Sequence, residues 1–304
     1  MARQRGLAAL PPSVVPTIDI AALLSDTGDA LAAGRGTPAA KAAVAALIDA
    51  ACTDVGFFGV VNHGLDERLR RGVLTEASAF FALPDAEKSR IAMPAGGASG
   101  GRGFQRMALN ETQGAADHHE AIDWIRSHAR DDGGSGSRSA ACQVVAASPS
   151  LAPLVHGANL WPRTPPTFAP LYGEYVEAML RTGHAVLRGM SLALGLPETR
   201  LSSWLAADSL WVMRAIRYPP LSPAARAGGV LGCGAHTDYG LLTLVNADES
   251  EGSLEVQDRA GLWRAARTPP SALVVNIGDM VNLLTAERWK STSIQGSPAA
   301  VWFP

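Results

Sequence analysis

From residue 210 onwards, the chain consists of short apolar runs separated by turn residues. The runs lie at 211–218, 241–245, 254–257, 262–264 and 273–277. Short strands at such close spacing are typical of an antiparallel sandwich or barrel. The pattern therefore predicts a β-rich core in the C-terminal part of the chain, and few other architectures accommodate it.

A long helical pattern precedes these strands. Between residues 168 and 194, apolar side chains recur mainly at steps of three and four residues, and Gly195 and Pro197 end the pattern. This spacing places the apolar side chains on one face of a helix. We expect one long helix that packs on the sheet.

The N-terminal part alternates between helical and extended patterns. We expect helices over 38–54 and 66–83, a short helical turn over 84–91, and extended segments over 14–20 and 57–61. Asp66 is placed to cap the second helix and Pro84 to end it. Together, the patterns predict a mainly β core with helical support, preceded by an α/β N-terminal region.

Glycine and serine mark the expected divisions of the chain. Residues 131–139 have the composition of a surface excursion or linker, and residues 96–103 that of a flexible connector. We therefore expect an N-terminal region at 14–130, a linker and surface excursion at 131–167, and the β-rich domain at 168–304.

The composition favours a small-molecule partner over nucleic acid or a membrane. The net charge is −2, so the chain has no basic footprint for nucleic acid. No apolar run is long enough to cross a bilayer, and the opening segment is too weakly apolar for a signal peptide. Cys52, Cys142 and Cys233 are odd in number and far apart, which fits a reducing compartment. We expect a cytoplasmic protein.

The tripeptide His236-Thr237-Asp238 is the strongest chemical signal in the chain. On a strand, residues two apart project to the same face, so the imidazole and the carboxylate can reach one ion. Fe(II) takes such a nitrogen and oxygen pair and keeps other coordination positions open. Without context, a surface histidine hydrogen-bonded to a nearby aspartate would be the simpler interpretation. The surrounding sequence therefore has to decide.

That surrounding sequence is similar to a known family. The run Gly234–Leu244 closely resembles the iron-binding segment of the isopenicillin N synthase-like family of Fe(II)/2-oxoglutarate-dependent oxygenases. Further matching segments follow in the family's order, at 15–19, 56–64, 80–84, 102–104, 159–162, 217–220 and 274–280. The resemblance runs from about Val14 to Ser293, and its colinearity makes it specific.

The resemblance implies a double-stranded β-helix, a jelly roll whose mouth holds iron. It implies Fe(II) bound by His236 and Asp238, with 2-oxoglutarate as co-substrate and O2 as oxidant. A small organic molecule would be oxidised while succinate and CO2 are released. Tyr218 stands where the phenol of many relatives binds a carboxylate of 2-oxoglutarate or of the substrate. As a sheet residue, it could also be a tyrosine with one solvated end.

The sequence departs from the family's pattern after Ser293. Ile294 stands where the family has its distal histidine, the third metal ligand, and has no lone pair to offer. The family's Arg-x-Ser pair, which clamps the far carboxylate of 2-oxoglutarate, would begin at Pro304. We therefore expect a jelly roll that lacks its last strands and leaves neighbouring strands with unpaired backbone groups. The abrupt change favours an altered reading frame, an unspliced segment or a truncated gene model.

Two classes of function are consistent with these residues. The first is a 2-oxoglutarate-dependent dioxygenase, with an oxidase that does not use 2-oxoglutarate as a narrower alternative. The second is a catalytically impaired or inactive truncated family member, a pseudoenzyme or small-acid-binding remnant, because losing a ligand weakens metal binding. The sequence does not identify the substrate. Met107, Asn110 and Trp124 are suggested as neighbours of its pocket.

A second histidine cluster carries a weaker signal. His118-His119-Glu120 lacks the HExxH spacing, and adjacent histidines on a strand point to opposite faces. We interpret it as a polar segment near the substrate mouth. Asp279, after Gly278, is better explained by turn chemistry than by catalysis.

Overall fold

The structure is a computed structural model. It describes residues 15–24, 36–95, 99–128, 140–205, 209–222, 224–225, 228–248, 254–296 and 301–303, and the side chains of 140–142 and 301–303 are not described. The expected linker at 131–139 and part of the glycine-rich connector lie outside these residues. Among the described residues, no helix has both the length and the apolarity needed to cross a membrane.

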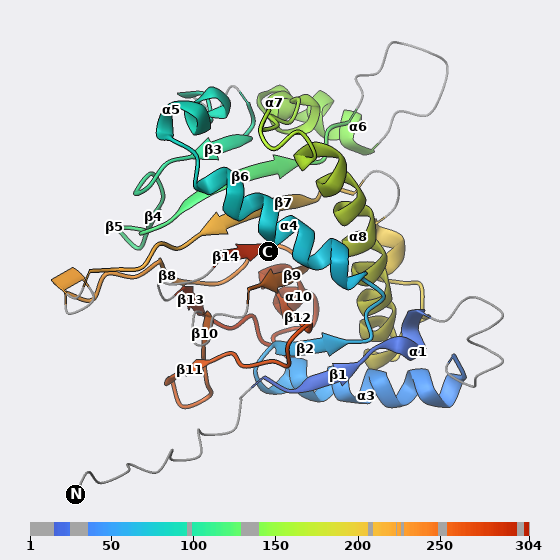
Figure 1. The fold of residues 1–304 in the computed structure, drawn as a ribbon. Coiled ribbons are helices and arrows are strands. Elements are labelled where there is room, and N and C mark those ends of the chain that lie inside the picture. Colours follow the sequence, from blue (N-terminus) through green and yellow to red (C-terminus); the bar gives the residue numbers. More distant parts are fainter. Residues whose placement is uncertain are drawn as a thin grey trace, which may run out of the picture.

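Helices dominate the first two thirds of the described chain, and strands the last third (Figure 1). The helices are α1 (Ala21–Leu24), α3 (Pro38–Asp54), α4 (Glu67–Phe81), α5 (Asp85–Lys88), α6 (Ala140–Ala147), α7 (Ala152–His156), α8 (Phe168–Ala193) and α10 (Asp279–Leu284), with short 3-10 turns at η1 (Ser89–Ile91), η3 (Pro149–Leu151) and η4 (Ser202–Leu205). The strands are β1 (Thr17–Asp19), β2 (Phe57–Val61), β3 (Gly103–Gln105), β4 (Glu111–Thr112), β5 (Ala115–Ala116), β6 (Glu120–Ile125), β7 (Val212–Arg217), β8 (Cys233–His236), β9 (Leu242–Ala247), β10 (Leu254–Gln257), β11 (Trp263–Ala265), β12 (Leu273–Ile277), β13 (Ile294–Gly296) and β14 (Val301–Phe303).

The strands form a large sheet facing a small one, with a separate β4–β5 hairpin. The large sheet has the order β1-β2-β12-β9-β14-β7-β6-β3, and the small sheet β11-β10-β13-β8. Strands from the N-terminal part, β1, β2, β3 and β6, thus flank the C-terminal strands in one sheet. This is the expected mainly β core, and the domain boundaries at 131 and 167 stay a prediction.

Helices cover one face of the large sheet, and the small sheet covers the other. Helix α8 packs against α3 and α4, and Figure 1 shows α4 and α8 running over the large sheet. Apolar side chains on that outer face, such as Trp124, Met213 and Val275, join the helices in one buried cluster. A second cluster, including Ile216 and Val256, fills part of the space between the two sheets. We call this space the barrel interior.

The helices begin and end largely where the sequence predicts. Helix α3 spans the expected 38–54, and Thr37 caps it by accepting a hydrogen bond from the Ala40 amide. Asp66 caps α4 in the same way, accepting from the amides of Arg68 and Leu69. These side-chain oxygens satisfy amide groups that have no partner within the helix. Local residue chemistry is therefore sufficient to set these ends.

The expectation of unpaired strand neighbours is wrong for the described strands. Strand β13 pairs with both β10 and β8, and β14 pairs with both β7 and β9. Backbone groups can pair in a ladder regardless of side chain, so residues that depart from the family's sequence still complete both sheets. The prediction of a shortened C-terminus is a separate matter and stays a prediction.

Candidate functional site

The predicted metal pair lies at one end of β8. His236 is the last residue of that strand and Asp238 follows in the loop before β9, so the two do not share a strand as the argument from alternation assumed. The atoms His236 Nε2 and Asp238 Oδ1 are nevertheless 3.8 Å apart. His236 Nδ1 lies 2.9 Å from the carbonyl oxygen of Gly234. A carbonyl can only accept, so Nδ1 carries the proton and Nε2 keeps a lone pair for an ion.

Two neighbours hold the Asp238 carboxylate by one oxygen. Thr243 Oγ1 donates to Asp238 Oδ2 at 2.5 Å, and Asn276 Nδ2 donates to the same oxygen at 2.7 Å. Thr243 and Asn276 are cross-strand partners on β9 and β12, which brings their side chains to one place. The other oxygen, Oδ1, is left to face His236. Such outer-shell hydrogen bonds orient a metal-binding carboxylate.

A further buried atom points to a group beside Asp238. Asn276 is 2 % exposed, and its Oδ1 has no hydrogen-bond partner among the described residues. A buried acceptor without a partner is uncommon, because it loses its bond to water and gains none. The unpartnered atom sits on the side chain that holds the predicted metal ligand. This arrangement fits an ion with further bound groups.

Ile294 lies directly across from His236. The two residues are Cα partners in the β8–β13 pair, and Ile294 is 8 % exposed within the apolar cluster of the barrel interior. Cross-strand partners project to the same face, so a histidine here would stand beside His236. An isoleucine supplies no donor atom. The described residues therefore fit Fe(II) at two coordination positions, and not at the third position that the family pattern predicts.

Tyr218 is buried in the barrel interior just after β7. It is 4 % exposed, so the alternative of a tyrosine with a solvated end does not hold. A Cβ atom at Gly232 would lie 2.5 Å from Tyr218 Cδ1, and one at Gly296 would lie 3.2 Å from the ring, so both glycines leave room for it. Burial raises the pKa of Tyr218 well above its usual value, which keeps the phenol neutral. Its predicted contact with 2-oxoglutarate stays a prediction.

A cluster of three polar residues, which the sequence analysis did not predict, lies next to His236 and Asp238. Asp117, His119 and Cys233 bring their possible ligand atoms within 4.8 Å of one another. Asp117 Oδ1 accepts from the Gly234 amide at 2.9 Å, and His119 Nδ1 lies 2.8 Å from the Gly232 carbonyl oxygen. Asp117 and His119 thus bond to the backbone on either side of Cys233, just before His236. In the sequence, the adjacent histidines at 118 and 119 were the only sign of this cluster. Nothing in the sequence showed that Cys233, which is distant along the chain, lies beside them.

These groups are neutral or already paired. Burial raises the pKa of Cys233 to about 11, and burial lowers the pKa of His119. The thiol therefore keeps its proton at neutral pH, and His119 Nε2 accepts from Asn110 Nδ2 at 3.0 Å. Cys233 Sγ lies 3.7 Å from His236 Nδ1. The arrangement is best explained as a network that fixes the β8 backbone around His236.

The three suggested pocket neighbours have different surroundings. Asn110 contacts His119 and so lies beside the barrel interior. Met107 is only partly buried. Trp124 is wrong as a pocket neighbour, because it is buried in the cluster under the helices, stacked on Trp161. The prediction failed because the sequence analysis did not recognise β6 as a strand. Along that strand, Trp124 alternates with residues that face the barrel interior, and so it points to the opposite face.

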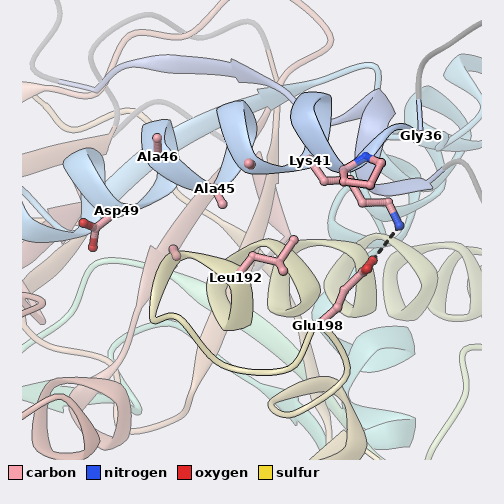
Figure 2. A pocket seen from close by; sticks show the side chains of 10 residues that line it. Gly36, Lys41, Ala45, Ala46, Asp49, Leu192 and Glu198 are labelled. Atoms are coloured by element: carbon pink, nitrogen blue, oxygen red, sulfur yellow. Dashed lines mark hydrogen bonds and ion pairs between the residues drawn. The ribbon is translucent and has the colours of Figure 1, made fainter.

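Two hollows on the described surface lie apart from this site. One of about 470 Å³ lies between α3 and α8, and two of its charged side chains, Lys41 and Glu198, bond to each other at 2.8 Å (Figure 2). Another of about 670 Å³ is lined by Asp54, Arg259 and Lys290 among others. Neither contains a predicted site residue, so neither changes the assignment of the barrel interior as the candidate site.

The fold is a jelly roll, and the close approach of His236 and Asp238 is what the class of jelly rolls with a non-haem metal site would show. Comparison with known proteins makes the family explicit. Residues 15–163 match the N-terminal model described as non-haem dioxygenase in morphine synthesis, and residues 209–293 match the 2OG-Fe(II) oxygenase superfamily. The second match ends one residue before Ile294.

Individual relatives agree with these matches. A homoarginine-6-hydroxylase of Glycine max is 38 % identical over 283 residues, covering 92 % of this chain and 80 % of the relative. A solved 2OG-Fe(II) oxygenase family protein of Caulobacter crescentus has a TM-score of 0.70 at 24 % identity, covering 96 % of this chain and 86 % of that one. JOX2, solved with 2OG, Fe and JA, has a TM-score of 0.69 at 22 % identity, covering 99 % and 79 %.

The chain belongs to the 2OG-Fe(II) oxygenase superfamily. Its class of activity is that of a 2-oxoglutarate-dependent dioxygenase, an oxidoreductase that uses Fe(II), 2-oxoglutarate and O2 on a small molecule. The relatives are named as enzymes of this class, which does not favour the alternative of an inactive remnant. The family resemblance drawn from the sequence is thus confirmed.

Proposed function

We propose that His236 Nε2 and Asp238 Oδ1 bind Fe(II), and that Tyr218 contacts 2-oxoglutarate beside them. The single observation that carries this proposal is the asymmetry of the Asp238 carboxylate. Its Oδ2 accepts two hydrogen bonds, from Thr243 and Asn276, while its Oδ1 is 3.8 Å from a histidine nitrogen with a free lone pair. When bound, Fe(II) with 2-oxoglutarate supplies the activation of O2 that couples decarboxylation of the keto acid to oxidation of the substrate.

The chain's own residues hold and shield this site. The Asp238 hydrogen bonds and the Gly234 carbonyl fix the two ligands in orientation before any ion arrives. The apolar cluster of the barrel interior, with Ile294 and Val256, excludes water from the side of the small sheet. Excluding water strengthens the electrostatic interactions within the site and limits side reactions.

We propose a free amino acid with a cationic side chain as the substrate, hydroxylated on carbon. Support comes from the Glycine max relative and from two Arabidopsis thaliana relatives that are 36 % and 37 % identical, all named homoarginine-6-hydroxylases. We also propose that the enzyme works in the cytoplasm without nucleic-acid or membrane partners. The small net charge of −2 supports this location and partner choice.

Anaerobic titration of the purified full chain with Fe(II) and 2-oxoglutarate tests the metal site. We expect the visible charge-transfer band of the chelate, and its absence with a folded protein by circular dichroism would reject the proposal. Supplying O2 and L-homoarginine should then give succinate and a product heavier by one oxygen atom. His236→Ala should abolish both signals, whereas full activity of that variant would place the site elsewhere.

A further inference from the structure

Strand β7 presents two different faces. Ile216 and, just after the strand, Tyr218 belong to the apolar cluster of the barrel interior, whereas Met213 and Ala215 belong to the cluster under the helices. Side chains alternate along a strand, so Arg214 shares its face with Ile216 and Tyr218. An arginine therefore stands on the inner wall of the barrel, on the same strand that leads to the predicted 2-oxoglutarate contact.

The neighbouring strands hold this arginine in one orientation. Asp123 on β6 is the Cα partner of Arg214, and its two carboxylate oxygens accept from Arg214 Nε at 2.5 Å and from Nη2 at 2.7 Å. Gln105 on β3 donates to the same carboxylate. The Asp123 side chain is only 6 % exposed. A bidentate pair of this kind fixes the plane of the guanidinium group.

The remaining edge of the guanidinium group is open. Arg214 Nη1 makes no hydrogen bond to the residues that the structure describes, and the side chain is 35 % exposed. The positive charge of Arg214 also acts on the interior, since it lowers the pKa of Tyr218 against the larger effect of burial. Arginine can bind one carboxylate on each edge of its fork. Here Nε and Nη2 already hold the Asp123 carboxylate, and Nη1 is left to donate to another.

We propose that Arg214 binds a carboxylate of a small-molecule ligand inside the barrel, and that Asp123 and Gln105 are its positioning residues. The inference rests on the proposed function. It deepens that function because a free amino acid and 2-oxoglutarate both carry a carboxylate away from the reacting carbon. Both sources present the same chemistry to Arg214, so the experiment has one arm for each.

Isothermal titration calorimetry without O2, with Mn(II) in place of Fe(II), measures ligand binding separately from turnover. L-Homoarginine and 2-oxoglutarate are titrated into the wild-type protein and into Arg214→Gln. Loss of one charge-assisted hydrogen-bonded contact should weaken binding of the affected ligand by about tenfold to a hundredfold. If Arg214→Gln binds L-homoarginine more weakly than the wild type does, the carboxylate belongs to the substrate. If it binds 2-oxoglutarate more weakly, the carboxylate belongs to the co-substrate.

Two further variants keep the test decisive. Arg214→Lys retains a charge beside Asp123 but loses the second edge of the fork, so it should fold and bind weakly. Arg217→Gln is the matched control, since Arg217 lies on the same strand, facing the helices, and its partner Glu120 keeps a second bond to Lys88 at 2.6 Å. We expect the control to bind both ligands like the wild type.

Unchanged binding of both ligands in folded Arg214→Gln and Arg214→Lys would overturn the proposal, as would an equal loss in Arg217→Gln. Failure of the proposed substrate gives a different result. If the wild type does not bind L-homoarginine at all, the substrate proposal is rejected, and the 2-oxoglutarate titration alone decides the role of Arg214.

Discussion

The two faces of the large sheet carry different kinds of side chain. Under the helices, residues such as Trp124 and Val275 are apolar and buried. On the inner face, the same strands carry Asp123, Arg214 and Asn276 among apolar neighbours. Burying polar groups costs free energy unless they are paired, and a chain selected for stability alone would have apolar residues there. The contrast teaches that the outer face supports the fold and the inner face supports the chemistry.

The largest expected effect tests the outer face. Trp124→Ala removes a side chain with no exposed surface whose Nε1 donates to the Leu160 carbonyl at 3.1 Å. We expect a loss of about 3–5 kcal/mol in the free energy of unfolding, from the cavity and the lost burial. Chemical denaturation measures it. Ligand affinity of the protein that remains folded should be unchanged, and a selective loss of 2-oxoglutarate binding would break the comparison.

The next effect tests the inner face. Asn276→Ala removes one of the two donors to Asp238 Oδ2 while leaving Thr243 in place. We expect metal affinity to fall by about tenfold to a hundredfold, as for other outer-shell partners of metal ligands. The charge-transfer titration reports this affinity, and thermal unfolding of the metal-free protein serves as the control. A large drop in stability with unchanged affinity would contradict the assignment.

A third variant adds a donor to the inner face. Ile294→His places an imidazole at the cross-strand position beside His236. Fe(II) affinity should rise by about tenfold or more, because a third protein ligand contributes at least one unit of log affinity. Ile294→Val is the size control without a donor atom. If the histidine variant binds Fe(II) no more tightly than wild type, then this position does not face the ion.

The smallest effect concerns one of the polar groups on the outer side. Arg70 is buried, donates a hydrogen bond to Asn246, and donates two hydrogen bonds to the Glu67 carboxylate oxygens at 2.8 Å each. The Arg70 hydrogen bonds are the main cause of a lowered pKa of Glu67, from 4.5 to about 2. A depressed carboxyl pKa stabilises the fold above pH 4.5, and this contribution is lost as the pH falls towards 2.

Glu67→Gln should therefore reduce the acid-dependent loss of stability between these pH values. Because the Glu67 side chain is 44 % exposed, solvent screening limits the difference to less than about 1 kcal/mol. Unfolding measured at pH 7 and near pH 3 checks the sign. An unchanged pH dependence would mean that the Arg70 pair contributes nothing to stability.

Much of the fold was predictable because its signals are local. Helix α3 and the Asp66 cap follow from residue propensity and from side chains that satisfy nearby amides. Strand β6 was not predicted, since both of its faces are buried and it carries Glu120 and Asp123 within an apolar run. Its charged side chains find partners on β7 and on the helical side, and a single segment does not reveal those partners.

The candidate site also has features that were predictable from the sequence and features that were not. The spacing of His236 and Asp238 predicted the metal pair, and colinearity with the family predicted that Ile294 occupies the third position. The roles of Thr243 and Asn276 were invisible, because they depend on the register of β9 against β12. The same holds for the β13 and β14 pairings, which the expectation of unpaired strands missed.

The sequence by itself determined the family of this protein and the helices around the sheet, and it predicted the two side chains proposed to bind the metal. Each of these depends on residues close together in the chain or on a collinear pattern. Only the tertiary structure decided that Asp238 is held by one oxygen, that Ile294 lies across from His236, and that Arg214 pairs with Asp123. Those features arise from contacts between distant strands, whose register is set by packing of the whole sheet and not by local preference.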